Sequence, residues 1–173
     1  MKLPIILIGF MASGKSSLGK KLARKLNLRF TDLDTEIEKR EGISITEIFK
    51  NKGEAYFRAL ETEILQEVLQ NKDHVIALGG GAVCHSNNID LVNGFGLSIY
   101  LKKSNAQLLG RLRQNKEERP LVADLNDVEL KSLIQEKMNE RAVFYEQAHL
   151  IIEEDKPKIS DLLERIQQLE VEK

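Results

Sequence analysis

Aliphatic runs alternate with amphipathic stretches along this chain. Four continuous apolar runs and one shorter segment predict strands, at residues 3–9, 29–33, 74–78, 97–101 and 149–152. Apolar residues recur at helical spacing around them, at about residues 18–26, 34–41, 44–51, 54–71, 104–114, 126–144 and 158–170. Because strands that alternate with helices need crossover connections, the pattern predicts an α/β fold with a five-stranded, mostly parallel sheet flanked by helices.

The turn between the first strand and the first helix carries a phosphate-binding motif. Residues 9–16 match the pattern G-x-x-x-x-G-K-[ST] in full. Backbone N–H groups of such a loop bind phosphate oxygens, and the predicted ATP-binding residues are Ala12, Ser13, Gly14, Lys15, Ser16 and Ser17. We expect Lys15 to reach the β- and γ-phosphates as a catalytic cation and the Ser16 hydroxyl to ligate Mg²⁺. The motif therefore predicts a nucleoside triphosphate site in a P-loop NTPase fold.

Composition narrows the class of protein. With 26 Lys and Arg against 27 Asp and Glu among 173 residues, the formal charge of −1 argues against a domain built to hold nucleic acid. The single cysteine, Cys84, excludes an internal disulfide and a thiolate zinc cluster. The apolar N-terminal run is too short for a signal peptide or a membrane span, so we expect a cytoplasmic protein without a membrane partner.

Candidate residues for a second substrate follow the second strand. Asp32 and Asp34 are two residues apart at its carboxyl end, so both carboxylates project from one side of the strand. One could hold Mg²⁺ through water while the other meets a hydroxyl-bearing substrate, and we assign the metal to Asp32 together with Ser16. A helix cap is the alternative role for Asp34.

Further candidates follow on a helix and after the third strand. Arg58 shares one helix face with Glu54 and Glu61. Surface salt bridges are one explanation, and a guanidinium held by carboxylates so that its planar fork binds a substrate carboxylate is the other. The glycines at 79–81 remove side chains where a ligand would approach the backbone. The sequence lacks the N/T-K-x-D guanine motif, which argues against a GTPase.

Taken in chain order, these motifs resemble those of the shikimate kinase family over about residues 3–165. They are the phosphate loop, the Asp-x-Asp pair, Gly-Glu-x-x-Phe-Arg-x-x-Glu, the glycine triplet, Arg119-Pro120-Leu121 and Arg141-x-x-x-Tyr145. The resemblance implies a parallel sheet of the nucleoside monophosphate kinase type and transfer of the γ-phosphate of ATP to the 3-hydroxyl of shikimate, with Mg²⁺. This step leads toward chorismate and the aromatic amino acids. The expected partners are ATP and shikimate, bound by a monomer.

The resemblance also implies roles for individual residues. Asp34 would hydrogen-bond the shikimate hydroxyls and assist deprotonation of the attacking one. Arg58 and Arg141 would bind the shikimate carboxylate, and the backbone at Gly80 and Gly81 would close that pocket. Arg119 would swing in on a lid and touch the transferring phosphate. Adenine would be framed by Arg111 or Arg113 on one side and by the region of Lys158 on the other.

The expected organisation is a single kinase domain over residues 1–173. It divides into a core at 1–33, 72–113 and 146–173, substrate-binding helices at about 34–71 and a lid at about 114–127. Two other functions stay open on the sequence. One is a kinase for another small polyol acid, such as gluconate, on the same scaffold. The other is a non-catalytic nucleotide-binding module, against which the intact Lys15, Ser16, Asp32 and Arg119 argue.

Overall fold

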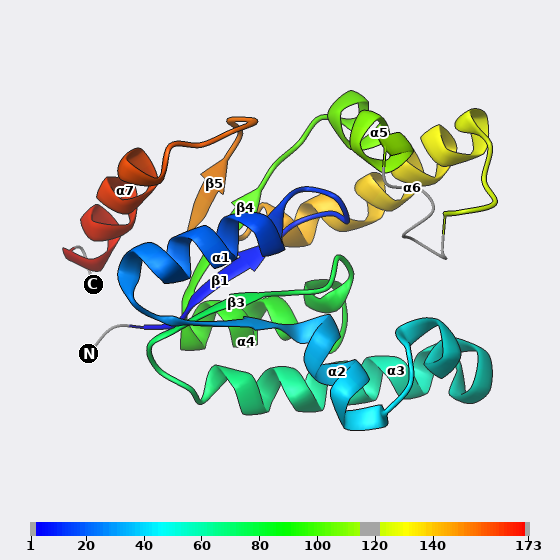
Figure 1. Ribbon diagram of the computed structural model, residues 1–173, viewed down its shortest axis with the longest axis horizontal. Coiled ribbons are helices and arrows are strands. Elements are labelled where there is room, and N and C mark those ends of the chain that lie inside the picture. The colour runs from blue at the N-terminus through cyan, green and yellow to red at the C-terminus, as the bar shows by residue number, and fades with distance from the viewer. Residues whose placement is uncertain (1–2, 115–121, 172–173) are drawn as a thin grey trace.

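The computed structural model describes residues 3–114 and 122–171, and a five-stranded parallel sheet runs through its centre in the order β2-β3-β1-β4-β5 (Figure 1). The strands are β1 (Ile5–Ile8), β2 (Arg29–Asp32), β3 (His74–Ala77), β4 (Leu97–Leu101) and β5 (Leu150–Ile152). The expected α/β fold with a parallel sheet is therefore confirmed.

Helices lie on both sides of this sheet. Over the described residues they are α1 (Lys15–Leu26), α2 (Leu33–Glu41), α3 (Ile45–Leu69), η1 (Ala82–Cys84), α4 (Asn88–Phe95), α5 (Asn105–Gln114), α6 (Asp127–Tyr145) and α7 (Ile159–Val171). The element α3 contains the two helices expected at 44–51 and 54–71, because the backbone at Gly53, with a φ of 83° and a ψ of 169°, is not helical and separates them. The short helices α4 and η1 were not predicted, because 8 and 3 residues give too few turns for a periodic signal.

The strand order places the phosphate loop at a topological switch point. After β1 the chain passes through α1 to the edge strand β2 and returns to β3 beside β1. It then crosses to β4 on the other side of β1. In open α/β sheets a ligand crevice forms at the carboxyl ends of the strands where the connections diverge. The register pairs Asp32 with Ala77 and Ala77 with Leu7, so the residues after β1, β2 and β3 meet at that edge.

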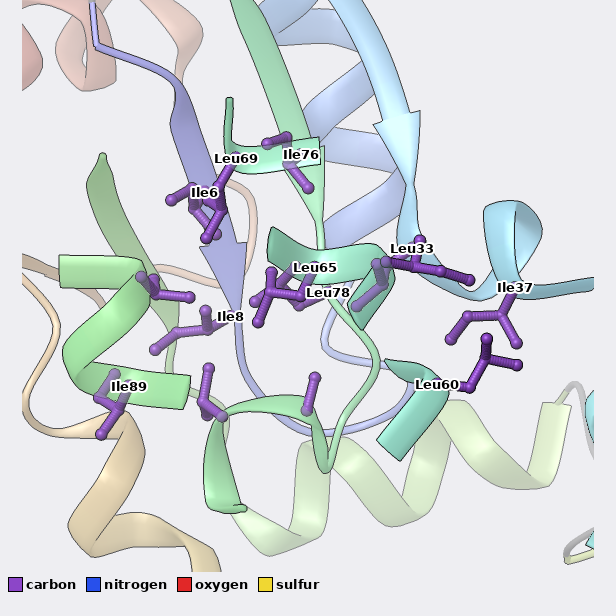
Figure 2. Packing of buried hydrophobic residues seen from close by; sticks show 14 of the residues in the cluster. Ile6, Ile8, Leu33, Ile37, Leu60, Leu65, Leu69, Ile76, Leu78 and Ile89 are labelled. Carbon is purple, nitrogen blue, oxygen red and sulfur yellow. The ribbon is translucent and has the colours of Figure 1, made fainter. Parts of the chain in front are cut away.

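One face of the sheet packs against α2, α3, α4 and the end of α6. Figure 2 shows Ile6, Ile8 and Ile76 of the strands beside Leu65 and Leu69 of α3. All of these side chains are at most 2% exposed. Each buried aliphatic side chain of this size contributes about 1.5–3 kcal/mol relative to an exposed one. The helix that carries Arg58 is thus anchored firmly to the sheet.

The opposite face is covered by α1 and α7, with Leu7, Leu22 and Leu162 in its apolar cluster. A third cluster joins the phosphate loop, through Phe10, to α5 and α6. In the part of the chain that the structure describes, no helix is both long and apolar enough to span a bilayer. The sheet and its three clusters hold the loops at the carboxyl edge of the strands in place.

Candidate active site

The phosphate loop follows β1 and turns through two glycines in conformations that other residues rarely adopt. Gly9 has a φ of 137°, and a Cβ there would lie 2.9 Å from the carbonyl oxygen of Leu101. Gly14 has a φ of 100° and precedes the first residue of α1. The loop therefore needs glycine at both motif positions and delivers the chain into the N-terminus of α1, where phosphate binding is favoured.

Lys15 is the first residue of α1 and is 8% exposed. Its ammonium donates hydrogen bonds of 2.8 Å to the carbonyl oxygens of both Gly9 and Phe10. The ammonium is thus held against the first two residues of the phosphate loop. Its expected contact with the β- and γ-phosphates stays a prediction.

Ser16 and Asp32 form a pair of oxygen donors beside the loop. The Ser16 hydroxyl donates a hydrogen bond of 2.6 Å to the Asp32 Oδ2. Hydroxyl and carboxylate oxygens suit Mg²⁺, which in kinases binds few protein ligands and takes its others from phosphates and water. The described residues hold no cluster of three or more His, Cys, Asp or Glu that could bind a metal. The donor set fits a magnesium ion bound together with a nucleotide.

A cavity of about 390 Å³ opens over the phosphate loop. Among the predicted ATP-binding residues, Ala12, Gly14, Lys15, Ser16 and Ser17 line it. Ser13 is 2% exposed and is not among the lining residues. The loop surface and its Lys15 therefore face one continuous space of a size suited to a polyphosphate.

The two arginines that were candidates for contact with adenine have different surroundings in the structure. Arg111 lines the nucleotide cavity, and its Nη1 donates to the carbonyl oxygens of Ala12 and Ser13 at 3.1 and 2.9 Å. Arg113 instead pairs with Asp127 at 2.8 Å. Lys158 is exposed just before α7 and is not among the residues that line the cavity, so its assignment stays a prediction. Arg119 lies outside the described residues.

A second cavity of about 690 Å³ lies beside the first. Its lining carries two guanidinium groups, from Arg58 of α3 and Arg141 of α6. Arg58 Nη1 lies 2.6 Å from Glu61 Oε2, and Arg58 Nε lies 3.4 Å from Glu54. The Glu61 residue is 1% exposed. A buried carboxylate therefore fixes the guanidinium of Arg58, as the helical spacing suggests.

The glycine triplet leaves room for these side chains. A Cβ on Gly79 would lie 2.6 Å from Asp34 Oδ1, and one on Gly81 would lie 3.0 Å from Arg58 Nη2. A Cβ on Gly80 would lie 3.1 Å from the backbone nitrogen of Met11. Each glycine thus allows a different functional group to approach the backbone, which explains why one tight turn carries three of them.

Asp34 lies between the two cavities and lines both of them, as do Met11 and Gly80. Burial, together with the charge of Asp32, raises the pKa of Asp34 from 3.8 to about 6, although Lys15 and Arg58 act in the opposite direction. Burial also raises the pKa of Glu61, and the ion pair with Arg58 opposes that rise. A carboxyl group whose pKa lies near neutrality, placed where two cavities meet, can accept a proton there.

Several lining residues were not predicted. Met11 occupies a variable position of the phosphate motif, and Phe49 and Phe57 contribute an apolar wall to the larger cavity, with ring centroids 4.6 Å apart. Tyr145 lines neither cavity and had no assigned role within its predicted motif, but its hydroxyl donates a hydrogen bond to the carbonyl oxygen of Gly80, which lines both. Apolar lining carries no periodic signal of its own, because such residues look like ordinary core in the sequence.

Comparisons with known proteins agree with this geometry. A family model described as Shikimate kinase matches residues 11–170. The shikimate kinase of Azobacteroides pseudotrichonymphae is 40% identical and covers 94% of this chain and 96% of its own length. The crystal structure of shikimate kinase from Bacteroides thetaiotaomicron has a TM-score of 0.89 at 39% identity, covering 96% of this chain and 97% of that one. A second structure, of the Acinetobacter baumannii shikimate kinase in complex with shikimate, has a TM-score of 0.86 at 33% identity, covering 99% and 94%. The chain therefore belongs to the shikimate kinase family.

Proposed function

We propose that this chain transfers the γ-phosphoryl group of ATP to the 3-hydroxyl group of shikimate. The observation that carries the proposal is the meeting of two cavities at Asp34 and Gly80. One cavity is lined by a phosphate loop, and the other is lined by two guanidinium groups suited to an organic acid. The complex of the Acinetobacter baumannii relative with shikimate supports the choice of acceptor.

On the donor side, the loop amides and Lys15 bind the polyphosphate and orient its outermost phosphorus toward the acceptor cavity. Ser16 and Asp32 would hold Mg²⁺, which neutralises charge on the phosphate oxygens when it is bound. Arg119 would add a further cation at the transferring group. Phosphoryl transfer depends on positioning and on charge neutralisation, and these residues supply both on the donor side.

On the acceptor side, the guanidinium forks of Arg58 and Arg141 bind the shikimate carboxylate, with the backbone at Gly80 and Gly81 closing the pocket. Glu61 keeps Arg58 in place through its 2.6 Å contact. Charge-assisted bonds of this kind are roughly twice as strong as neutral ones and impose orientation. The acid is thus anchored at one end, and its hydroxyl groups are directed toward Asp34.

Asp34 accepts a hydrogen bond from the attacking hydroxyl and takes its proton as the new oxygen–phosphorus bond forms. A pKa of about 6 leaves the carboxylate mostly ionised near neutral pH and still basic enough to accept a proton. The proton moves from the hydroxyl to Asp34, and ADP leaves with the electron pair of the broken bond.

The organisation of the chain follows from this assignment. We infer a single kinase domain in which residues 34–71 bind the acid. Residues 115–121 of the lid expected at 114–127 lie outside the described residues. We also infer a monomer in the cytoplasm, and light scattering of the purified chain tests the oligomeric state.

An assay of ADP release with several acceptors tests the proposal. Shikimate, gluconate and nucleoside monophosphates are compared side by side with Mg·ATP. We expect a strong preference for shikimate and a product phosphorylated at the 3-hydroxyl, identified by NMR. A preference for gluconate would show that the acceptor is a different polyol acid. Tight ATP binding with no transfer to any acceptor would contradict catalysis altogether.

A further inference from the structure

A buried tyrosine hydroxyl contacts the backbone at the boundary between the two cavities. Tyr145 ends α6 and is 0% exposed. Its hydroxyl donates a hydrogen bond to the carbonyl oxygen of Gly80. Gly80 lines both cavities and packs against the phosphate loop, since a Cβ on it would lie 3.1 Å from the backbone nitrogen of Met11. The hydroxyl therefore holds the peptide that separates the donor and acceptor spaces.

The same hydroxyl is connected to Arg141, one helical turn earlier on α6. Burial raises the pKa of Tyr145, while the charge of Arg141 and a hydrogen bond from its side chain act in the opposite direction. The Arg141 guanidinium also lies over the ring of Phe10, 5.7 Å from its centroid. A phenol can accept one hydrogen bond while it donates another. Tyr145 thus stands between a guanidinium that binds the acid and the glycine turn.

We propose that Tyr145 is a positioning residue for the acceptor, fixing the Arg141 guanidinium and the Gly80 peptide relative to each other. The inference rests on the proposed function, in which both groups meet the shikimate carboxylate. Removing the hydroxyl leaves the Gly80 carbonyl without this donor and releases one restraint on Arg141. Because a bidentate fork binds well only when it is held close to its productive geometry, affinity for the acid should fall.

The chain offers a matched control for this experiment. Tyr100 of β4 packs on Tyr145 with ring centroids 5.0 Å apart. It is 1% exposed and is not among the residues that line either cavity. Tyr100→Phe therefore deletes a buried hydroxyl from the same aromatic pair and leaves the contact between Tyr145 and Gly80 intact.

Steady-state kinetics and calorimetry on the unmodified chain, Tyr145→Phe and Tyr100→Phe test the proposal. In Tyr145→Phe we expect the KM and Kd for shikimate to rise about tenfold while the KM for ATP changes by less than about twofold. The preference for shikimate over its methyl ester should fall by a similar factor, since that preference depends on the guanidinium groups. Tyr100→Phe should keep all of these values within about twofold of the unmodified chain.

Unchanged shikimate affinity in Tyr145→Phe, or an equal loss in both variants, would overturn the positioning role. Thermal unfolding of the two variants separates this role from a general loss of stability. A merely structural hydroxyl lowers the unfolding temperature and leaves the acid-over-ester preference as it was. If the unmodified chain neither binds nor phosphorylates shikimate, the proposed function has failed, and that result is distinct from an active enzyme that is indifferent to Tyr145→Phe.

Discussion

Replacing Asp34 by asparagine should abolish most activity and at the same time stabilise the folded protein at alkaline pH. The carboxyl group has a pKa of about 6 in the folded chain against 3.8 as its ordinary value. The folded state therefore binds this proton more tightly than the unfolded state, so stability falls as the pH rises from about 4 to about 6. At about 1.4 kcal/mol per pKa unit, the ionised carboxylate costs on the order of 3 kcal/mol above that window.

The asparagine side chain of D34N carries no charge at any pH. The variant should therefore not lose this part of its folding stability as the pH rises. Denaturant unfolding at about pH 8 should show the variant more stable than the unmodified chain by up to about 3 kcal/mol, and the difference should vanish near pH 4. Turnover of shikimate should fall by about a hundredfold or more, as expected for the loss of a general base. Asp90→Asn changes an exposed carboxylate on α4, outside both cavities, and serves as the control for both measurements.

Two results would refute this reasoning. One is a difference in unfolding free energy between D34N and the unmodified chain that is the same at both pH values, because a burial cost must disappear when the group is protonated. The other is a D34N variant that phosphorylates shikimate at the unmodified rate, since Asp34 would then neither accept the proton nor orient the acceptor.

The other predictions concern the acceptor pocket. Arg58→Ala should raise the KM for shikimate by at least about thirtyfold, because a charge-assisted contact is lost and Glu61 is left buried without its partner. Arg24→Ala on the exposed surface of α1 should change the KM little, and full turnover by Arg58→Ala would count against the pocket. Gly79→Ala should slow turnover by more than about tenfold with ATP affinity unchanged, because the new methyl group meets Asp34, whereas Gly94→Ala, with nothing within 4 Å, should not. Shikimate methyl ester should bind at least about tenfold more weakly than the acid by calorimetry. Equal affinity would contradict binding of the carboxylate by the guanidinium groups.

The phosphate loop and its flanking elements could be predicted because their signals are local. One continuous segment contains the buried run before Gly9, the two glycines and the helix that begins at Lys15. Each of these features indicates the conformation of its own backbone. The helical spacing likewise suggested the contact of Arg58 with Glu61, since residues three apart share a helix face. These parts of the site depend on contacts between residues that are close together in the sequence, so the sequence alone predicts them.

Other parts of the site depend on contacts between distant segments. Tyr145 reaches Gly80 across 65 positions, and its place beside the glycine turn is set by the packing of α6 against the sheet. Arg111 and Arg113 are two positions apart on α5, and only the packing of that helix determines which of them reaches the phosphate loop. Individual side-chain patterns do not encode such packing, so Arg141 entered the prediction through family resemblance alone.

A crystal structure with ADP and shikimate tests the central claim most directly. We predict that the shikimate carboxylate contacts Arg58 and Arg141, that the 3-hydroxyl lies beside Asp34, and that this oxygen faces the β-phosphate of ADP across the space left for the transferred group. Shikimate bound away from the phosphate loop, or bound with its carboxylate directed to solvent, would contradict the account.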